Sequence, residues 1–364
     1  MIALFSLLVW LYLFFAHGRF WLSTPELPPA APEGCPDVDI VVPARDEAHT
    51  IGPVIASLLG QDYRGKCRVI LVDDNSTDGT AALAGTAANL TIITLQSKPV
   101  EWSGKLWALS QGVAASRAPV LLFTDADIVH DPRHLSSLVA KLEQSRTDMV
   151  SEMVRLNCAS LAERALVPAF VYFFQMLYPF SRVNDPSSAV AAAAGGTVLI
   201  RREALQRIGG IEAIKNSLID DVALAKSVKR SGAIFLGHSG LAVSIRPYPT
   251  FADIWDMITR TAFTQLRYSP VLLALTLLGL SVVWLAPAAA ILGMRGWSFG
   301  FGLAAFGLAV ISYMPTLARY GRNRLWALAL PLIALFYMAA TLGSALNYWR
   351  GQGARWKSRA YGSG

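Results

Sequence analysis

Four uninterrupted apolar runs constrain the fold of this chain more than any other feature. One run covers 2–16, and three follow Tyr268, at about 270–294, 297–317 and 325–348. A helix needs about 20 apolar residues to cross a bilayer, so each of the later runs is long enough, and the first is near the short limit. No basic segment precedes the first run and no small-residue cleavage site follows it. We therefore expect a retained membrane anchor rather than a secretory signal.

Charge is scarce and unevenly placed along the chain. Of the 364 residues, 16% are charged, and the net charge is +7. From Ser269 onward there are eight basic residues and no acidic ones, whereas 25–268 holds 23 basic and 25 acidic residues. A nucleic-acid-binding protein would carry its positive charge on the folded domain. We therefore exclude nucleic acid as a partner and interpret the basic residues as signals of membrane topology.

These basic residues set the expected orientation of the membrane segments. Arg19 directly follows the first run, so the positive-inside rule predicts that the region after it is cytoplasmic. Basic residues on both sides of 325–348 would mark both of its ends as cytoplasmic, which a single crossing does not allow. Pro331 and Gly343 could break this segment into a re-entrant hairpin, and the number of spans stays open. The residues on the two sides are Arg319, Arg322 and Arg324, then Arg350, Arg355, Lys357 and Arg359.

The middle of the chain alternates predicted strands and helices. Strands rich in β-branched residues and leucine, separated by helices, are typical of a mostly parallel α/β sheet. Ligands of such sheets bind at the carboxyl ends of the strands. Strands are predicted at 38–43, 68–72, 90–95 and 120–124, and helices at 49–59, 78–89 and 105–116.

Acidic residues follow these strands and should meet in one cleft. Asp125 and Asp127 form a D-x-D turn, a pattern suited to Mg²⁺ or Mn²⁺ held by one or two carboxylates and substrate phosphates. The structural alternative is a turn that only caps the next helix. Asp73 and Asp74 would repel each other, so we expect a base or ribose hydroxyl to supply them with donors. No glycine-rich phosphate loop is present, so a phosphate ligand would depend on a metal and basic side chains.

Two further features point to chemistry beyond this turn. Asp220 and Asp221 precede a predicted helix, where they would serve either as its N-cap or as a general base. Lys105 opens another predicted helix, an unfavourable place for a cation unless an anionic ligand lies nearby. His130 and His134 have helical i,i+4 spacing, but Pro132 lies between them, and we interpret this spacing as accidental.

Together these motifs resemble the inverting family 2 glycosyltransferases of GT-A fold. The resemblance covers about 38–268, and the motifs stand in the family's order. Its overall organisation is most similar to the hopene-associated glycosyltransferases, and more distantly to the ceramide glucosyltransferases. The matching segments are VVPARDE at 41–47, DDNSTDGT at 73–80, Lys105, TDAD at 124–127, the glycines Gly195 and Gly196, and the acidic pair at 220–221.

The resemblance implies a role for each matching residue. Asp221 would be the catalytic base, and Asp127 with Asp125 would hold Mg²⁺ or Mn²⁺ on the donor diphosphate. Many membrane relatives carry Q-x-x-R-W, whereas this chain has TQLRY at 264–268 and keeps only Arg267 of that motif. This departure favours transfer of a single sugar over polymer synthesis. Residues implied in nucleotide-sugar binding, with a UDP-sugar favoured, are Ala44, Glu47, Asp73, Asp74, Lys105, Asp125 and Arg267.

Two apolar segments suggest that the acceptor is a membrane lipid. The length of Leu166–Phe180 would suit a core helix, but its crowded aromatic residues favour an interfacial one. Phe251–Tyr268 is amphipathic as well. We expect both to hold the cleft against the bilayer, where the hydroxyl of a hopanoid or related lipid alcohol could reach it.

The predicted organisation is a multi-pass protein of the cell (inner) membrane with a cytoplasmic catalytic domain. Polysaccharide synthesis is one alternative function. A non-catalytic membrane protein with a decayed transferase domain is another, although the retention of Asp74, Asp127 and Asp221 together argues against decay. The expected parts are an anchor at 1–23, a Pro-rich linker at 24–37, a GT-A domain at 38–249, an interfacial helix at 250–268, membrane segments at 269–349 and a basic tail at 350–364.

Overall fold

The computed structural model describes residues 1–352, 354–356 and 359–361. Lys357 and several other positions of the predicted basic tail lie outside the described residues. The chain forms two compact units. Residues 24–157 and 182–246 make up the first, which we call the sheet unit. Residues 1–23, 158–181 and 247 onward make up the second, which we call the helical unit.

The sheet unit is built on eight strands in the order β3-β2-β1-β4-β7-β6-β8-β5, counted over the described residues. Parallel pairs join β1 to β2 and β4, β2 to β3, and β6 to β8, whereas β4–β7, β6–β7 and β5–β8 are antiparallel. The predicted mostly parallel α/β sheet is therefore confirmed. The strands are β1 (Val38–Ala44), β2 (Cys67–Asp73), β3 (Leu90–Thr94), β4 (Val120–Thr124), β5 (Ile128–His130), β6 (Met149–Arg155), β7 (Thr197–Arg201) and β8 (Ile234–Ser244).

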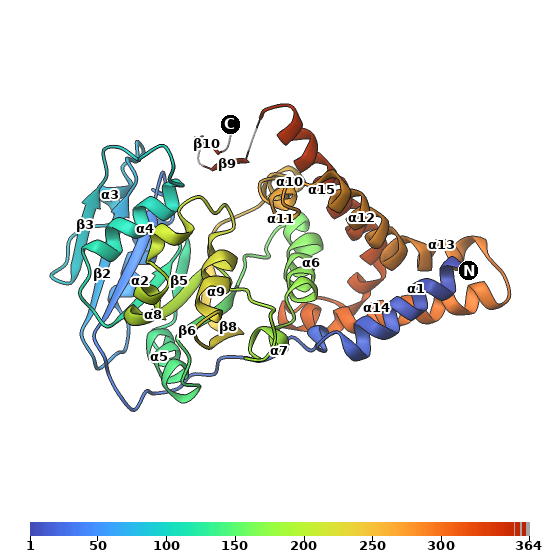
Figure 1. Ribbon diagram of the computed structural model, residues 1–364, viewed down its shortest axis with the longest axis horizontal. Helices are drawn as coiled ribbons and strands as arrows, with labels where there is room; N and C mark the ends of the chain where they lie inside the picture. Colours follow the sequence, from blue (N-terminus) through green and yellow to red (C-terminus); the bar gives the residue numbers. More distant parts are fainter. Residues whose placement is uncertain (353, 357–358, 362–364) are drawn as a thin grey trace. The chain divides into compact units, whose positions relative to one another are not determined.

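Helices pack on this sheet and bury its apolar side chains (Figure 1). All seven residues of β1 are buried, because it lies between two neighbouring strands and under α4. Val54, Ile55 and Leu58 of α2 join the same core. The helices of the sheet unit are α2 (Ile51–Leu59), α3 (Thr80–Leu83), α4 (Gly104–Ala114), α5 (His134–Gln144), α8 (Arg202–Arg207), η3 (Ile211–Ile214) and α9 (Asp220–Lys229), and α7 (Phe180–Val183) lies where the chain enters this unit.

One buried carboxylate ties β1 to its surroundings. Asp39 is 6% exposed and accepts two hydrogen bonds from Arg68 of β2, at 3.0 and 2.8 Å. The Ser116 hydroxyl donates a third at 2.6 Å. Because a buried charge is tolerated only when it is paired and hydrogen-bonded, this cluster holds the start of β1 in place.

The helix predicted at 78–89 is wrong in extent, since α3 covers only Thr80–Leu83. Gly79 before it and Gly85 after it both have positive φ, 87° and 75°. Glycine adopts this left-handed conformation without steric cost. The two glycines therefore confine the helix to about one turn, although the alanines between them favour a longer one.

The helical unit contains three helical stretches that are long and apolar enough to cross a membrane, among the residues described. They are Pro270–Gly293, Trp297–Arg319 and Arg324–Trp349. The helices of this unit are α1 (Ile2–Leu11) with η1 (Tyr12–Ala16), η2 (Phe20–Leu22), α6 (Leu161–Leu177), α10 (Phe251–Thr259), α11 (Ala262–Gln265), α12 (Pro270–Leu280), η4 (Ser281–Leu285), α13 (Ala286–Gly293), α14 (Trp297–Arg319), η5 (Arg324–Ala329) and α15 (Leu330–Trp349).

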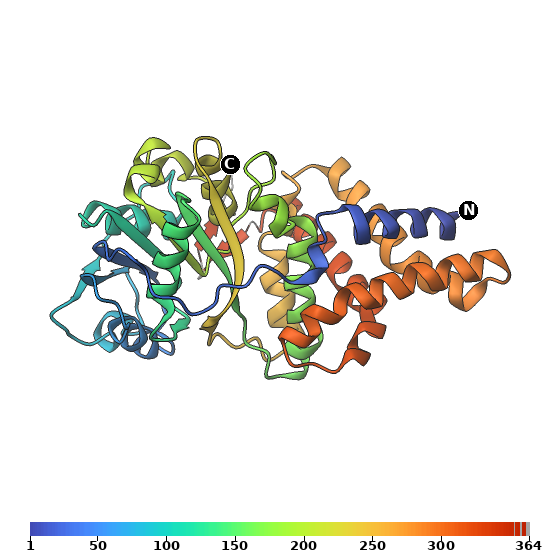
Figure 2. The same ribbon diagram turned by 90° about the horizontal axis from the view of Figure 1, so that it is seen from below.

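The short N-terminal helix packs alongside two of these stretches. Helix α1 runs beside α14 and contacts α13 (Figures 1 and 2). Trp10 is fully buried and donates a hydrogen bond from its indole nitrogen to the carbonyl oxygen of Val283 at 2.8 Å. Its ring meets that of Trp284 edge to face, with centroids 5.0 Å apart. The N-terminal apolar run is thus an integral member of the helical unit.

The prediction of an interfacial helix at Leu166–Phe180 is wrong, because α6 is a core helix of the helical unit. The Tyr172 hydroxyl lies 2.6 Å from that of Ser312 on α14. The Tyr337 hydroxyl of α15 donates to the carbonyl oxygen of Leu166 at 2.9 Å. Phe173 packs edge to face on Tyr337, with centroids 4.9 Å apart. The aromatic residues that suggested a membrane surface pack instead against other helices.

The re-entrant hairpin suggested for 325–348 does not form. Pro331 lies in the first turn of α15, where proline costs no helical hydrogen bond. Gly343 lies inside the same helix, next to the Trp255 ring of α10. Arg324 and Arg350 therefore stand at opposite ends of one continuous helical stretch, Arg324–Trp349. The amphipathic segment predicted at 250–268 consists of two shorter helices, α10 and α11.

Candidate active site

The carboxyl ends of β1 and β2 are joined by a charge pair. Asp74 directly follows β2 and is 2% exposed. Its Oδ2 lies 3.4 Å from Nη1 of Arg45, which directly follows β1. The same nitrogen donates to the carbonyl oxygen of Asp74 at 2.7 Å. The repulsion expected between adjacent carboxylates is thus balanced by a cation of the protein.

Asp73 and Ala44 shape the turn that carries Asp74. The Asp73 carboxylate accepts hydrogen bonds from the backbone amide of Ser76, at 3.2 Å, and from the Ser76 hydroxyl. The carbonyl oxygen of Ala44 accepts one from the Asp74 amide at 2.8 Å. Asn75 completes the turn with a left-handed φ of 56°, a conformation that asparagine tolerates better than most residues. Asp73 is therefore engaged within the turn.

Arg246, which follows β8, connects the acidic groups of two strand ends. Its Nε donates to Oδ2 of Asp127 at 2.8 Å, and its Nη2 donates to Oε1 of Glu47. The Ser244 hydroxyl donates to the same oxygen of Asp127 at 3.2 Å. Glu47 and Asp127 are only 8% and 7% exposed. One guanidinium thus compensates two nearly buried carboxylates.

Next to these strand ends lies a pocket that is open to solvent. Lys105 at the start of α4 contributes its ammonium group, which lies 2.9 Å from Oδ1 of Asp125 and 3.2 Å from Oδ2 of Asp220. Burial alone would lower the pKa of Lys105, but the two carboxylates raise it above its ordinary value. They also explain a cation at a helix N-terminus without a bound anion. The pocket is lined by Lys105, Thr124, Asp125, Gly195, Asp220 and Asp221, and by apolar side chains of α4, β4, β7, η3 and α9.

Asp221 is the carboxylate of this pocket that suits proton transfer. Burial, and next the neighbouring Asp220, raise the pKa of Asp221 to about 7, whereas Lys105 opposes this shift. Both aspartates are the first residues of α9, so the N-cap alternative for them is wrong. An acidic first turn still complements the helix dipole. A carboxylate whose pKa is near neutrality is well matched to general base catalysis at physiological pH.

Gly195 brings the chain close to Asp221. A Cβ added to Gly195 would lie 3.2 Å from Oδ2 of Asp221. The backbone of Gly195 also hydrogen-bonds the Asp221 carboxylate, an interaction that favours its ionised form. The loop before β7 therefore forms one wall of the pocket at the proposed base.

Asp125 and Asp127 fit a divalent cation that is shared with a ligand. Within the described residues there is no group of three or more His, Cys, Asp or Glu side chains that could hold a metal alone. Two carboxylates of a D-x-D turn offer hard oxygen donors, and Mg²⁺ in proteins is commonly held by one or two carboxylates together with substrate phosphates. The donor set thus matches a metal whose remaining ligands come from a diphosphate and water.

Comparison with known proteins identifies the region that carries this site. Residues 39–209 match the family model described as Glycosyl transferase family 2. These residues therefore match a glycosyltransferase family 2 domain. The family 2 resemblance expected from the sequence is confirmed for this region. The matched range includes β1, β2, β4, the D-x-D turn and the Gly195–Gly196 loop, and it ends before Asp221.

Curated relatives match segments of this chain, and their names refer to dodecaprenyl phosphate and to 4,4'-diaponeurosporenoate. A dodecaprenyl-phosphate galacturonate synthase of Rhizobium johnstonii is 26% identical over 117 residues, 31% of this chain and 35% of that protein. A 4,4'-diaponeurosporenoate glycosyltransferase of Staphylococcus haemolyticus is 31% identical over 98 residues, 27% of this chain and 26% of that protein. The matched segments thus span about a third or less of these relatives.

A solved structure extends the likeness to nearly the whole chain. It is a mannosyltransferase of Pyrobaculum calidifontis in complex with GDP-Man and Mn²⁺. It matches with a TM-score of 0.56 at 20% identity, over 94% of this chain and 98% of that one. This likeness confirms the predicted GT-A fold.

The structure brings most of the residues proposed from the sequence together, in two groups. Lys105, Asp125 and Asp221 line the pocket, and Asp127 is tied through Arg246 to Glu47. Ala44, Asp73 and Asp74 surround the turn after β2. Arg267 belongs instead to the helical unit, where it follows α11 with a left-handed φ of 52°.

Two features of the sheet unit were missed at the level of the sequence. Arg246 carries no motif, and its only signal is a basic residue two positions after a strand. The pair His130 and His134, interpreted as accidental, is hydrogen-bonded in the sheet unit with ring nitrogens 2.8 Å apart. Pro132 does not separate them, because it lies in the turn before α5 and His134 is the first residue of that helix.

Proposed function

We propose that this protein is a membrane-bound inverting glycosyltransferase that moves one sugar from a nucleotide sugar to a lipid hydroxyl. The observation that carries this proposal is Asp221. Its carboxylate, with a pKa of about 7, lines the same pocket as Lys105 and the first aspartate of the D-x-D turn. A proton acceptor and a cationic group of the kind that holds a diphosphate are thus placed in one pocket of a family 2 domain.

The reaction follows from these positions. Asp221 accepts the proton of the acceptor hydroxyl, and the acceptor oxygen forms a bond to the anomeric carbon. The bond between that carbon and the donor diphosphate breaks, and the nucleoside diphosphate leaves with the electron pair. Attack opposite to the leaving group inverts the anomeric configuration. Lys105 faces Asp125 and Asp220, close enough to the D-x-D turn to stabilise negative charge on the departing diphosphate.

We assign the rest of the donor site to the ends of β1 and β2. Asp74, with Ala44, Glu47 and Asp73, would contact the nucleoside, for which we favour uridine. Asp127 and Asp125 would hold Mg²⁺ or Mn²⁺, which supplies charge neutralisation on the donor diphosphate when bound. We keep Arg267 as a donor-binding residue on the strength of its match to the family motif alone.

Two observations support a lipid acceptor. The helical unit exposes large apolar side chains, including Phe5 (57%), Leu275 (58%) and Leu332 (73%) on three different helices. Such surface is stable when lipid covers it. Both curated relatives have names that specify a lipid-phosphate or carotenoid-acid substrate. Among lipid alcohols we favour a hopanoid, because the arrangement of anchor, catalytic region and terminal membrane block is most similar to hopene-associated glycosyltransferases.

We further propose that the protein is a multi-pass protein of the cell (inner) membrane with its catalytic domain in the cytoplasm, where nucleotide sugars are made. The domain boundaries expected from the sequence stay part of this proposal, with the catalytic domain at 38–249 and the membrane segments at 269–349. Arg19, directly after the N-terminal apolar helix, supports this orientation by the positive-inside rule.

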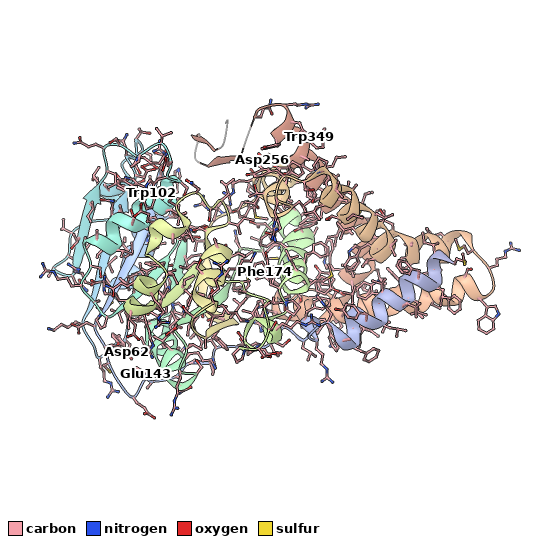
Figure 3. All side chains as sticks on the ribbon, in the orientation of Figure 1. Asp62, Trp102, Glu143, Phe174, Asp256 and Trp349 are labelled. Atoms are coloured by element: carbon pink, nitrogen blue, oxygen red, sulfur yellow. The ribbon has the colours of Figure 1, made fainter. Side chains whose placement is uncertain are left out.

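The test is a transfer assay on the full chain in lipid nanodiscs. Purified protein is incubated with single radiolabelled UDP-sugars or GDP-mannose, with Mn²⁺ or EDTA, and with membrane lipids that include hopanoid alcohols. The proposal predicts a labelled glycolipid carrying one sugar and no product in EDTA. Asp221→Asn should abolish the product. Asp62→Asn, at an exposed loop position after α2 (Figure 3), is the matched control and should not. A long labelled polymer would favour polysaccharide synthesis, and no turnover of any donor would favour a decayed domain.

A further inference from the structure

A chain of buried hydrogen bonds runs through the sheet unit behind the D-x-D turn. Glu152 of β6, His134 of α5 and His130 of β5 are at most 3% exposed. Glu152 Oε1 contacts Nε2 of His134, and the two Nδ1 atoms of the histidines lie 2.8 Å apart. Nε2 of His130 lies 3.1 Å from the hydroxyl of Thr124, the last residue of β4. No part of the proposed mechanism uses these side chains.

The direction of the chain is set at its Thr124 end. The Thr124 hydroxyl lies 2.9 Å from the carbonyl oxygen of Gly196, which can only accept. A hydroxyl has one proton to donate, and the Thr124 hydroxyl donates it to the carbonyl oxygen of Gly196. His130 must therefore donate from Nε2 to the Thr124 oxygen. Burial, and next the neighbouring His134, hold the pKa of His130 well below its ordinary value. A neutral His130 that is protonated on Nε2 accepts at Nδ1.

The same logic continues to Glu152. Because His130 accepts at Nδ1, His134 must donate from its own Nδ1. Nε2 of His134 contacts Oε1 of Glu152, and the second oxygen of Glu152 is buried without a hydrogen-bond partner within the described residues. The Glu152 carboxyl group therefore fixes the orientation of the His134 ring, as outer partners of a site histidine commonly do.

The Thr124 end of this series of hydrogen bonds lies in the proposed active site. The carbonyl oxygen of Gly196 accepts from the Thr124 hydroxyl and also from the backbone amide of Asp125, at 3.3 Å. Gly195, one residue earlier, hydrogen-bonds Asp221. The hydrogen-bonded side chains therefore reach the D-x-D turn and the Gly195–Gly196 loop through one atom, the carbonyl oxygen of Gly196.

We propose that Glu152, His134 and His130 are positioning residues, whose hydrogen bonds run in one direction from His134 to Gly196, orient the Thr124 hydroxyl and thereby fix the Gly195–Gly196 loop between the D-x-D turn and Asp221. This role rests on the proposed function, because it is the transfer reaction that the positioning serves. None of the three touches the sugar or the acceptor.

The arrangement is tested directly by the tautomers of the two histidines. In the full chain labelled with ¹⁵N-histidine, ring-nitrogen NMR signals are assigned by their loss in His130→Gln and His134→Gln. This arrangement predicts that His134 carries a proton on Nδ1 and that His130 carries its proton on Nε2 alone. A proton on Nδ1 of His130, or a His134 ring without a proton on Nδ1, would overturn it. This measurement needs no turnover, so its outcome does not depend on whether the proposed function is correct.

The positioning role is tested by paired variants of Glu152. The amide of Glu152→Gln keeps a polar partner for Nε2 of His134, and this variant should keep most of the wild-type kcat. Glu152→Leu removes this partner, and its kcat should fall about 10–100-fold, the range typical when a supporting partner of a site residue is lost. Ser137→Ala removes another buried hydroxyl from α5 and serves as the control for general destabilisation, with unchanged kcat. An active Glu152→Leu, or a Glu152→Gln as impaired as Glu152→Leu, would contradict the proposal. If wild type transfers no sugar, the proposed function fails instead.

Discussion

At the scale of single residues, the site is organised by cations that partner carboxylates. Arg45 pairs with Asp74, Arg246 with Asp127 and Glu47, and Lys105 with Asp125 and Asp220. Each pair allows acidic groups to lie close together at the strand ends. Among the described residues no cation forms an ion pair with Asp221, so burial, and next Asp220, raise its pKa to about 7 although Lys105 opposes the shift.

The raised pKa of Asp221 predicts the acidic limb of the pH profile. A general base must be ionised, so kcat/KM should rise with pH through about 7 and then level off. Below that value it should fall about tenfold for each pH unit. Steady-state transfer by wild type between pH 5 and 9 checks this. A profile flat from pH 5 to 7, measured where the protein stays folded, would contradict the assignment of Asp221 as the base.

Loss of Arg246 should cost stability. Arg246→Gln leaves Glu47 and Asp127, 8% and 7% exposed, without their shared cation, and the free energy of unfolding should fall by about 1–3 kcal/mol. Thermal unfolding in detergent measures the effect as a lower Tm. Arg133→Gln is the matched control, because its ion pair with Asp131 is at the surface, with 58% of the arginine side chain exposed, and solvent screening should leave the Tm nearly unchanged. Equal effects of the two substitutions would contradict this account.

The sequence predicts the acidic residues of the site better than their partners. Asp74, Asp125, Asp127 and Asp221 stand next to predicted strands or helices, and local pattern is enough to find them. Arg246 reaches Glu47 across 199 positions of sequence, and such long-range pairing has no local signature. The orientation of His130 toward His134 likewise depends on a turn whose geometry the i,i+4 spacing does not reveal.

At the scale of elements, short loops decide where the site residues point. The ends of β1, β2, β3 and β4 all lie within one residue of their predicted positions, because each strand is an apolar run followed by polar turn residues. Helix α3 was predicted too long, because the left-handed Gly79 and Gly85 override the helix propensity of the alanines between them. Helix α6 was misassigned, since an apolar helix packed on other helices and one on a membrane surface have similar sequences.

The Gly195 loop should be sensitive to one added methyl group. In Gly195→Ala the new Cβ would lie 3.2 Å from Oδ2 of Asp221, and the carboxylate would have to move by a few tenths of an ångström. We expect kcat to fall about tenfold with little change in Tm, because catalysis depends steeply on the position of the base. Gly240→Ala, an exposed position where a Cβ would meet nothing within 4 Å, is the control. Unchanged kcat in Gly195→Ala would argue against Asp221 as the positioned base.

The start of β1 should be sensitive to acid. Burial alone would raise the pKa of Asp39, but hydrogen bonds from Arg68 and Ser116 lower it below the ordinary 3.8. A lowered folded-state pKa stabilises the fold above the ordinary value, and this contribution disappears as the pH falls through the folded-state pKa. Asp39→Asn should therefore lower the free energy of unfolding by about 1.5–3 kcal/mol at neutral pH and reduce its loss in acid. Asp37→Asn, two residues earlier and exposed, should change neither, and equal acid sensitivity of Asp39→Asn and wild type would refute the assignment.

At the scale of the whole molecule, the chain combines a family 2 domain with helices long and apolar enough to cross a membrane. The length of the apolar runs made these long apolar helices predictable from sequence. Packing between them was not predictable, because contacts such as Trp10 with Trp284 depend on which faces of the helices meet.

The orientation of the protein is open to a protease test. We expect trypsin to cleave the sheet unit in inverted membrane vesicles and not in right-side-out ones, because Arg19 follows the first apolar helix and nucleotide sugars are cytosolic. Immunoblotting of a tag inserted at the exposed Gly240 reports the cleavage. Cleavage in right-side-out vesicles alone would place the domain on the outer side and contradict the proposal.

The most direct test of the central claim compares binding and turnover in Asp221→Asn. The amide keeps the shape of the carboxylate and cannot accept the acceptor's proton. Calorimetric titration of the nucleotide sugar should give the wild-type Kd within about threefold, because a general base contributes to the transition state rather than to ground-state binding. Transfer to lipid should fall by about two to four orders of magnitude. Transfer at a rate close to that of wild type, or loss of donor binding in a folded variant, would contradict the claim that Asp221 is the base of a sugar transferase.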